Sequence, residues 1–133
     1  MRKAVYVPDV PGGPADYSQV VVAGNLVFVA GTVGKDMATD TWPTGVAGQM
    51  DQALKNLAKI LAAAGCGLDD VVKITTFITP GYIGADGAER HKADELFDQA
   101  FAEPRPAQSA PIVALPVPEA LISIEAIAVK PNA

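Results

Sequence analysis

The clearest hydrophobic pattern in the chain lies in residues 121–129, with the sequence LISIEAIAV. Side chains of a strand alternate between the two faces of a sheet, so this pattern predicts a strand with two unlike faces. One face is entirely apolar and belongs in a core; it comprises Ile122, Ile124, Ala126 and Ala128. The other face mixes aliphatic side chains with a hydroxyl and a carboxylate, and we expect only partial cover for it; it comprises Leu121, Ser123, Glu125, Ile127 and Val129.

Other segments also have strand character. The apolar run after Pro106 is joined to residues 121–129 by a Pro-rich reversal, which predicts that the two runs pair as strands. The dipeptide Gly24-Asn25 between two apolar runs favours a hairpin turn. β-Branched and apolar residues predict the remaining strands, at residues 2–7, 19–23, 26–30 and 71–79.

Two segments have helical character. Residues 46–64 carry apolar side chains at helical spacing, with Thr44 as a candidate cap and Gly65 as the terminating glycine. A second helix is predicted at about residues 88–102, after a Gly-rich loop at 80–87. The resulting order is β-β-β-α-β-α-β-β, which is typical of an α+β domain, here a single one over residues 1–133.

The predicted elements leave one surface without cover. Two helices coat only one face of a sheet of about six strands, so the opposite face, with Leu121, Ile127 and Val129, would be exposed in a monomer. Exposed apolar area of this kind usually marks an interface. The sequence therefore predicts self-association.

The net charge and the composition limit the classes of partner that the protein is expected to bind. The net charge is −5 and no Lys/Arg cluster occurs, whereas nucleic-acid binding depends on neutralising phosphates, so we expect no nucleic-acid partner. No apolar run approaches the roughly 20 residues that cross a bilayer, and the start MRKAVYVPDV lacks the apolar segment of a signal peptide. A cytoplasmic protein without a membrane partner is the expectation.

Common catalytic motifs are missing from the sequence. One histidine and one cysteine, Cys66, do not make a metal site with the usual number of ligands, and no loop has phosphate-binding spacing. We therefore expect neither a metal nor a cofactor.

Three segments together resemble the Rid (YjgF) family of small trimeric proteins: residues 16–34, 49–78 and 106–129. Their shared features are a Tyr-Ser-Gln start, a Q-x-x-x-A-L-x-N-L helix ending in A-A-G, and a final P-A-R…L-P…E-x-E-A-x-A motif. The resemblance implies a chorismate mutase-like fold, with a six-stranded mixed sheet and two helices on one face. It also implies a homotrimer whose sheets pack into a central barrel and whose clefts between subunits bind a small organic molecule.

In Rid deaminases these clefts hydrolyse enamines and imines to ketones and ammonia. The resemblance gives the Arg of P-A-R the role of binding the substrate carboxylate, the first Glu of E-x-E that of positioning a water, and a Tyr, here Tyr17, that of closing the pocket. In this chain the Arg position is Gln108 and the Glu position is Ser123, so both charged groups are replaced. The helix Asn of many members corresponds to Asp94.

The remaining candidates have two interpretations each. Arg105 and Glu119 are either replacements for the missing charges or solvated surface groups, and Glu125, the second Glu of the motif, is either catalytic or structural at the interface. The candidate catalytic residues are Tyr17, Gln108, Ser123 and Glu125. The candidate substrate-binding residues are Gly31, Thr32, Asp94, Arg105, Ser109 and Glu119.

Two functions follow from the resemblance. The first is a hydrolase or deaminase that acts on a substrate other than the usual amino-acid-derived imines, because Gln108 and Ser123 offer only neutral hydrogen bonds. The second is a non-catalytic ligand-binding or chaperone-like member. Some members are called endoribonucleases, but the acidic composition gives that activity no electrostatic support.

Overall fold

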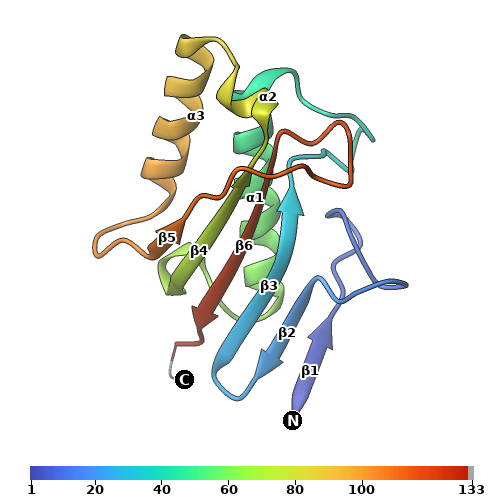
Figure 1. The fold of residues 1–133 in the computed structure, drawn as a ribbon. Helices are drawn as coiled ribbons and strands as arrows, with labels where there is room; N and C mark the ends of the chain where they lie inside the picture. Colours follow the sequence, from blue (N-terminus) through green and yellow to red (C-terminus); the bar gives the residue numbers. More distant parts are fainter. Residues whose placement is uncertain (132–133) are drawn as a thin grey trace.

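In the computed structural model, which describes residues 1–131, six strands form one twisted sheet with the helices packed against one face (Figure 1). The spatial order of the strands is β1-β2-β3-β6-β4-β5. Only β4 and β5 run parallel, so the sheet is mixed, as predicted. The strands are β1 (Arg2–Val5), β2 (Val20–Ala23), β3 (Leu26–Val33), β4 (Val71–Ile78), β5 (Ala107–Ser109) and β6 (Ile122–Val129).

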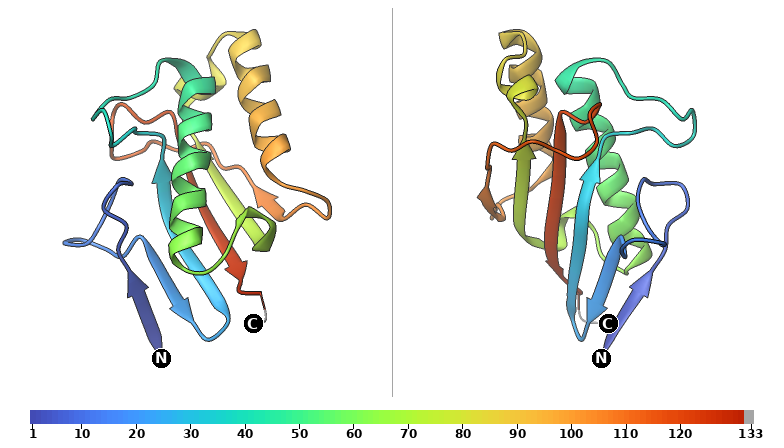
Figure 2. Two further views of the ribbon diagram at one scale, coloured as in Figure 1. Left: turned by 180° about the vertical axis from the view of Figure 1, so that it is seen from behind. Right: turned by 45° about the vertical axis from the view of Figure 1, so that its right-hand side comes forward.

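The two long helices cover the same face of the sheet, as the turned views show (Figure 2). Thr44 precedes the first of them without a side-chain capping bond, and Gly65 follows it with a φ of +85°, the left-handed conformation expected of a terminating glycine. The predicted loop at 80–87 contains a further short helix, which Thr79 caps by accepting a hydrogen bond from Tyr82 N. The helices are α1 (Gly45–Ala63), α2 (Pro80–Ile83) and α3 (Gly87–Ala100).

The alternation predicted for β6 is confirmed. Its four core-face side chains are at most 3% exposed and pack against the helix layer, whereas Glu125 is exposed and Ile127 is half-buried. Burial of each of the two isoleucines, Ile122 and Ile124, contributes about 1.5–3 kcal/mol. One face of β6 thus belongs to the core, and the other remains open.

The predicted pairing of the two C-terminal runs is wrong. β5 has only three residues and pairs in parallel with β4, while β6 lies between β3 and β4 (Figure 1). Both edges of β6 are therefore occupied, and the intervening segment contains prolines, which lack the N–H that a ladder requires. Residues 110–120 instead continue beside the end of β4, through a bridge between Ile112 and Ile78, and then run as an irregular segment. The prolines of this segment are Pro111, Pro116 and Pro118.

Three buried amide side chains fix the loops around the sheet. Gln19 accepts a hydrogen bond from Val7 N at 2.7 Å and donates to Val7 O at 3.0 Å, which holds the loop before β2. Gln49 donates to Glu119 O at 2.9 Å and accepts from Leu121 N at 2.8 Å, which fixes the entry to β6. A third amide, Asn56, donates to two carbonyls at and just after the end of β3, those of Val33 and Lys35.

Candidate functional site

One candidate cavity lies on the open face of the sheet, where β3 and β6 meet the segment before β6. It has a volume of about 430 Å³, and we call it the β3–β6 cavity. Four of the predicted site residues line it, which places three candidate catalytic side chains and one glycine together. Its lining is Tyr17, Ser18, Ala30, Gly31, Val33, Leu115, Pro116, Val117, Ser123 and Glu125.

Gly31 keeps the floor of this cavity open. It lies in an irregularity of β3, between the register positions of Val29 and Thr32. A Cβ atom at position 31 would come within 2.8 Å of Ser123 Oγ, closer than real Cβ contacts. Without that carbon, the Ser123 hydroxyl has space on the cavity side although the residue is only 6% exposed.

A second cavity, of about 380 Å³, lies between the edge of the sheet and α3, and we call it the β5–α3 cavity. Gln108 contributes an amide whose Nε2 donates to Thr76 Oγ1 at 3.4 Å. Asp94 faces the same space from α3. The lining is Met50, Thr76, Ile78, Tyr82, Arg90, Asp94, Phe97, Asp98, Gln108 and Ala110.

Gln108 and Ser123 lie on opposite faces of the sheet. Gln108 is the register partner of Ile74, which is fully buried in the core on the helix side. Ser123 alternates with the core residues Ile122 and Ile124 and therefore faces the open side. The two residues that replace the family's charged groups thus belong to different cavities of one chain.

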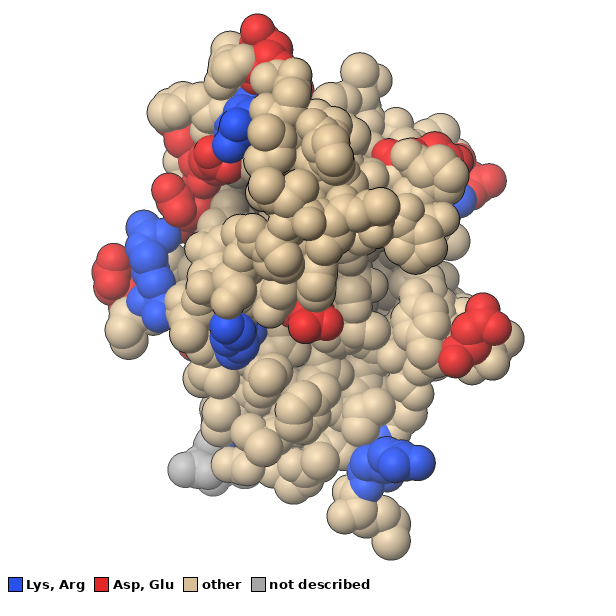
Figure 3. All heavy atoms as spheres, in the orientation of Figure 1, with Lys and Arg blue, Asp and Glu red and all other residues tan. Residues whose placement is uncertain are grey.

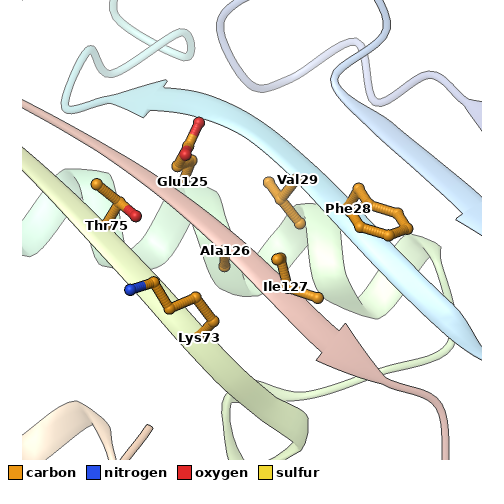
Figure 4. A pocket seen from close by; sticks show the side chains of 7 residues that line it. All are labelled: Phe28, Val29, Lys73, Thr75, Glu125, Ala126 and Ile127. Carbon is orange, nitrogen blue, oxygen red and sulfur yellow. The ribbon is translucent and has the colours of Figure 1, made fainter. Parts of the chain in front are cut away.

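Glu125 ends a row of polar side chains across the open face. Thr75 is the register partner of both Ser109 and Glu125, so the three residues lie side by side on β5, β4 and β6. Lys73 Nζ donates to Ser109 Oγ at 3.1 Å. Beside this row lies a shallow hollow of about 250 Å³, in which Figure 4 shows Lys73, Thr75 and Glu125 next to Phe28 and Ile127.

Charge is sparse around this row. Figure 3, which looks onto the face opposite the helices, shows that most of the charged side chains lie toward the margins and that the middle is largely uncharged. The exposed apolar side chains of this face include Phe28, at 42% exposure, and Leu26, at 38%. The face therefore has the apolar character expected of an interface.

On the helix side, Asp94 has a close donor. The Tyr82 hydroxyl donates to Asp94 Oδ1 at 2.7 Å. Burial and, after it, the carboxylate of Asp94 raise the pKa of Tyr82 well above its usual value, so the phenol remains a proton donor at neutral pH. Asp94 is thus a hydrogen-bonded carboxylate within the β5–α3 cavity.

Three of the predicted site residues lie elsewhere. Arg105 donates to the side chains of Asp98 and Glu103 and lines a separate hollow beside the start of β4. Glu119 is exposed, and the Gln49 bond uses its backbone carbonyl. The Thr32 side chain is buried on the core side, where its hydroxyl donates to Ala30 O at 2.9 Å.

Tyr82 and Arg90 also line the β5–α3 cavity, and neither was predicted from the sequence. A signal was available for the second, because positions 90, 94 and 97 lie at i, i+4 and i+7 and share one face of α3. Tyr82 lies in a segment predicted as a loop, where no helical spacing marks it. Its place in the cavity depends on α2, a single turn of helix.

Within residues 1–131, no cluster of three or more potential ligands (His, Cys, Asp or Glu) has the geometry to hold a metal ion. Cys66 is half-buried, and burial raises the pKa of its thiol, which is the opposite of the change that activates a cysteine. Within the same residues, no helix combines the length and the apolar character that a membrane span requires.

Comparisons with known proteins agree with this architecture. Residues 9–130 match the family described as Endoribonuclease L-PSP. The chain is 34% identical to a RutC family protein of Pyrococcus horikoshii, over 98% of this chain and 99% of that protein. It is 33% identical to the 2-iminobutanoate/2-iminopropanoate deaminase of Homo sapiens, over 98% of this chain and 91% of the relative.

A solved structure gives the same answer for the fold. The crystal structure of RidA from the Antarctic bacterium Psychrobacter sp. superposes with a TM-score of 0.81 at 32% identity, and the match covers 96% of this chain and 98% of that one. The mixed six-stranded sheet with its helices on one face is therefore the Rid architecture. Sequence match and fold agree, and the chain belongs to the Rid family, whose matching description is Endoribonuclease L-PSP.

Proposed function

We propose that this protein hydrolyses the C=N bond of a small imine, or of the enamine in equilibrium with it, in a site completed between two copies of the chain. The observation that carries the proposal is the division of the predicted site residues between two cavities on opposite faces of the sheet. One copy alone does not bring Gln108 and Ser123 together. A second copy seated on the open apolar face supplies the missing half, in a homotrimer.

The named relatives support the type of reaction. The human relative and several other mammalian ones are called 2-iminobutanoate/2-iminopropanoate deaminases, at 32–36% identity. In such a reaction, water adds to the imine carbon, and the carbinolamine formed then loses ammonia to leave a carbonyl compound. Atoms and protons balance without an oxidant, a reductant or a metal.

The lining of the β3–β6 cavity suits this chemistry. Glu125 contributes the only carboxylate of that lining, and a carboxylate orients water and accepts a proton from it. The hydroxyls of Tyr17 and Ser123 are hydrogen-bond donors for a carbonyl oxygen or a leaving amine. We assign Glu125 the role of positioning the water, because Ser123 is neutral at the position where the family carries a Glu.

The substrate in this proposal differs from the usual amino-acid-derived imines. Gln108 offers an amide where the family offers a guanidinium, and an amide forms weaker contacts to a carboxylate than a charge-assisted pair does. RNA cleavage is not proposed, since the net charge of −5 opposes phosphate binding. The cytoplasmic location expected from the sequence stays a prediction.

The test is ammonia release from imines generated in place. Neutral imines and 2-iminopropanoate would be supplied at equal concentration, with the Glu125→Gln variant as the matched control, because it keeps the shape and removes the charge. We expect protein-dependent release from at least one imine and little release with Glu125→Gln. Rapid turnover of 2-iminopropanoate would contradict the altered substrate preference, and no release from any imine would favour the non-catalytic alternative.

A further inference from the structure

Tyr17 lines the β3–β6 cavity and belongs to the loop between β1 and β2. Its side chain is 49% exposed, so the surrounding chain covers only part of the ring. The covered part includes the hydroxyl end, because a Cβ atom at Gly12 would come within 2.6 Å of the Tyr17 hydroxyl oxygen and within 3.2 Å of Cζ. The hydroxyl end of Tyr17 therefore packs directly against the backbone of Gly12.

This contact requires a glycine at position 12. Gly12 has a φ of +102°, a conformation that residues with a Cβ rarely adopt, and Gly13 follows with a φ of +47°. A Cβ atom at Gly13 would come within 2.9 Å of the backbone oxygen of Tyr17. The loop thus approaches Tyr17 at its hydroxyl and at its backbone, and both approaches depend on the absence of a Cβ.

The buried side chain of Gln19 holds this part of the loop in place. The residue is 2% exposed, and its Oε1 accepts a hydrogen bond from Val7 N at 2.7 Å. Its Nε2 faces a group of four carbonyl oxygens at 3.0–3.3 Å, which belong to Val7, Val10, Pro11 and Gly12. One buried amide therefore fixes the backbone on which the Tyr17 hydroxyl rests.

The backbone of Gln19 joins this loop to the cavity. The Gln19 carbonyl oxygen accepts a hydrogen bond from Ala30 N at 2.9 Å, and Ala30 lines the β3–β6 cavity beside Gly31. The next residue, Val20, pairs with Val29 of β3. Gln19 is thus held by the sheet on one side and holds the loop on the other.

We propose that Gln19 and Gly12 are positioning residues that fix the Tyr17 hydroxyl at the β3–β6 cavity. This inference rests on the proposed function, in which that hydroxyl donates to a carbonyl oxygen or a leaving amine. The ring is half exposed, so without the contact at Gly12 the side chain could turn to another rotamer and remove the hydroxyl from the cavity. Displacing a group by about 1 Å lowers a rate by as much as about 100-fold.

Fluorine NMR tests the positioning without an activity. The chain has three tyrosines, so labelling with 3-fluorotyrosine gives signals from Tyr6, Tyr17 and Tyr82, and the Tyr17→Phe variant assigns one of them. Gly12→Ala places a methyl group on the hydroxyl, and Gln19→Glu turns a carboxylate toward four carbonyls. Each should move the Tyr17 signal toward that of the free amino acid, whereas the Tyr82 signal, from the other cavity, should stay in place.

Gly24→Ala is the matched control for the loop glycine. Gly24 also has a positive φ, of +62°, but a Cβ atom there would meet nothing within 4 Å. This change adds backbone strain without a contact to Tyr17 and should leave the Tyr17 signal in place. Circular dichroism and light scattering would establish folding and assembly. If Gln19→Glu fails to fold, Gly12→Ala tests the proposal by itself, because it changes no hydrogen-bonding group.

A double-mutant cycle connects the position of Tyr17 to turnover. On an imine that wild type hydrolyses, Gln19→Glu should lower kcat about tenfold or more and change KM less, because the hydroxyl acts on the reacting group. In a Tyr17→Phe background the same change should lower kcat less than about twofold, because the hydroxyl is already absent. A residue that only stabilises the fold would lower kcat equally in both backgrounds.

The outcomes separate this inference from the proposed function. A Tyr17 signal that stays in place in both loop variants, or that moves as far in Gly24→Ala, would overturn the positioning role. Equal losses of kcat in the two backgrounds would overturn it as well, and imine hydrolysis by wild type would then leave the proposed function intact. No ammonia release from any imine, together with the expected fluorine shifts, would remove the proposed function and leave Gln19 and Gly12 as the residues that position Tyr17.

Discussion

The two faces of the sheet use the same strand for different purposes. On the helix face, β6 presents four small or aliphatic side chains that are almost completely buried. On the open face, the same strand presents Ser123, Glu125 and Ile127, which line the β3–β6 cavity and the adjacent hollow. The comparison shows that one face of the strand belongs to the core, whereas the other stays open and is the face to which we assign ligand binding and association.

The two positions that depart from the family motif, Gln108 and Ser123, also have different charged neighbours. Gln108 lies on the helix side, in a cavity that retains a guanidinium from Arg90, whereas Ser123 lies on the open side, next to the carboxylate of Glu125. Each cavity therefore keeps one charged group of the sign that the family motif would have supplied. Within one copy, a substitution at either position acts directly on one cavity only.

The largest expected effect is loss of assembly in Ile127→Asp. Ile127 is half-buried on the open face, beside its register partner Lys73. In a trimer an aspartate there would be a buried charge, and its desolvation costs several kcal/mol even beside that lysine. Light scattering should show trimers for wild type and smaller species for the variant at micromolar concentration. The matched control is Ile83→Asp, at an exposed isoleucine of α2 outside the sheet, which should remain trimeric.

Either of two results would contradict this interpretation of the open face. A wild-type mass equal to one chain would mean that the face is not covered by copies of the same protein. An Ile127→Asp variant that keeps the wild-type mass would place the interface elsewhere. In both cases the two-copy site would lose its support.

A second prediction restores the family's charges on both faces. Gln108→Arg combined with Ser123→Glu should raise the affinity for 2-oxobutyrate at least about tenfold, since a charge-assisted hydrogen bond contributes about 1.5–3 kcal/mol. Each single change should do less, because an isolated charge in a partly dry cleft carries a desolvation cost. Calorimetry would measure the gain, with Gln99→Arg plus Thr39→Glu as an exposed control of equal charge.

If the folded double variant and wild type bind 2-oxobutyrate with equal affinity, the two cavities are separate sites. Such a result would mean that Gln108 of one copy and Ser123 of another do not face a common ligand. Activity of the wild type on imines would then have to be assigned to one cavity alone.

Local sequence patterns were enough to predict the helices and strands but not which strands lie side by side. The two faces of β6 and the glycine after α1 follow from periodicity and backbone conformation, which are local properties. The position of β6 between β3 and β4 is a long-range pairing, and no local signal distinguishes it from pairing with the preceding run. The predicted strand pair therefore failed where the rest of the order held.

The candidate site was predictable to the same extent. The resemblance assigned Tyr17 and Ser123, which share a cavity, and Gln108, which lies in another, because motif positions carry no information about which face a cavity occupies. Arg105 and Glu119 were candidates because they lie close in sequence to the motif residues. In the fold, Arg105 pairs with Asp98 and Glu103 and lines neither cavity, although Asp98 itself lines the β5–α3 cavity.

The smallest predicted effect concerns Gln49, which links the two faces. Its amide, buried in the helix layer, holds Glu119 O and Leu121 N, and so fixes the irregular segment whose residues 115–117 line the β3–β6 cavity. Gln49→Ala leaves both backbone groups without this partner, which should lower the free energy of unfolding by about 1–3 kcal/mol. Urea unfolding would measure that loss at fixed protein concentration, because association alters apparent stability.

The matched control is Gln52→Ala, since Gln52 lies on the same helix and its side chain, among residues 1–131, bonds only to that of Asn56, at 2.9 Å. If Gln49 acts by holding the segment, Gln49→Ala should also weaken ligand binding in the β3–β6 cavity. Ligand binding in the β5–α3 cavity should change less, because residues 115–117 do not line that cavity, although Met50 of α1 does. Equal weakening at both cavities would indicate a general loss of packing around α1. Unchanged ligand binding despite lower stability would mean that residues 115–117 keep their position without the Gln49 bonds.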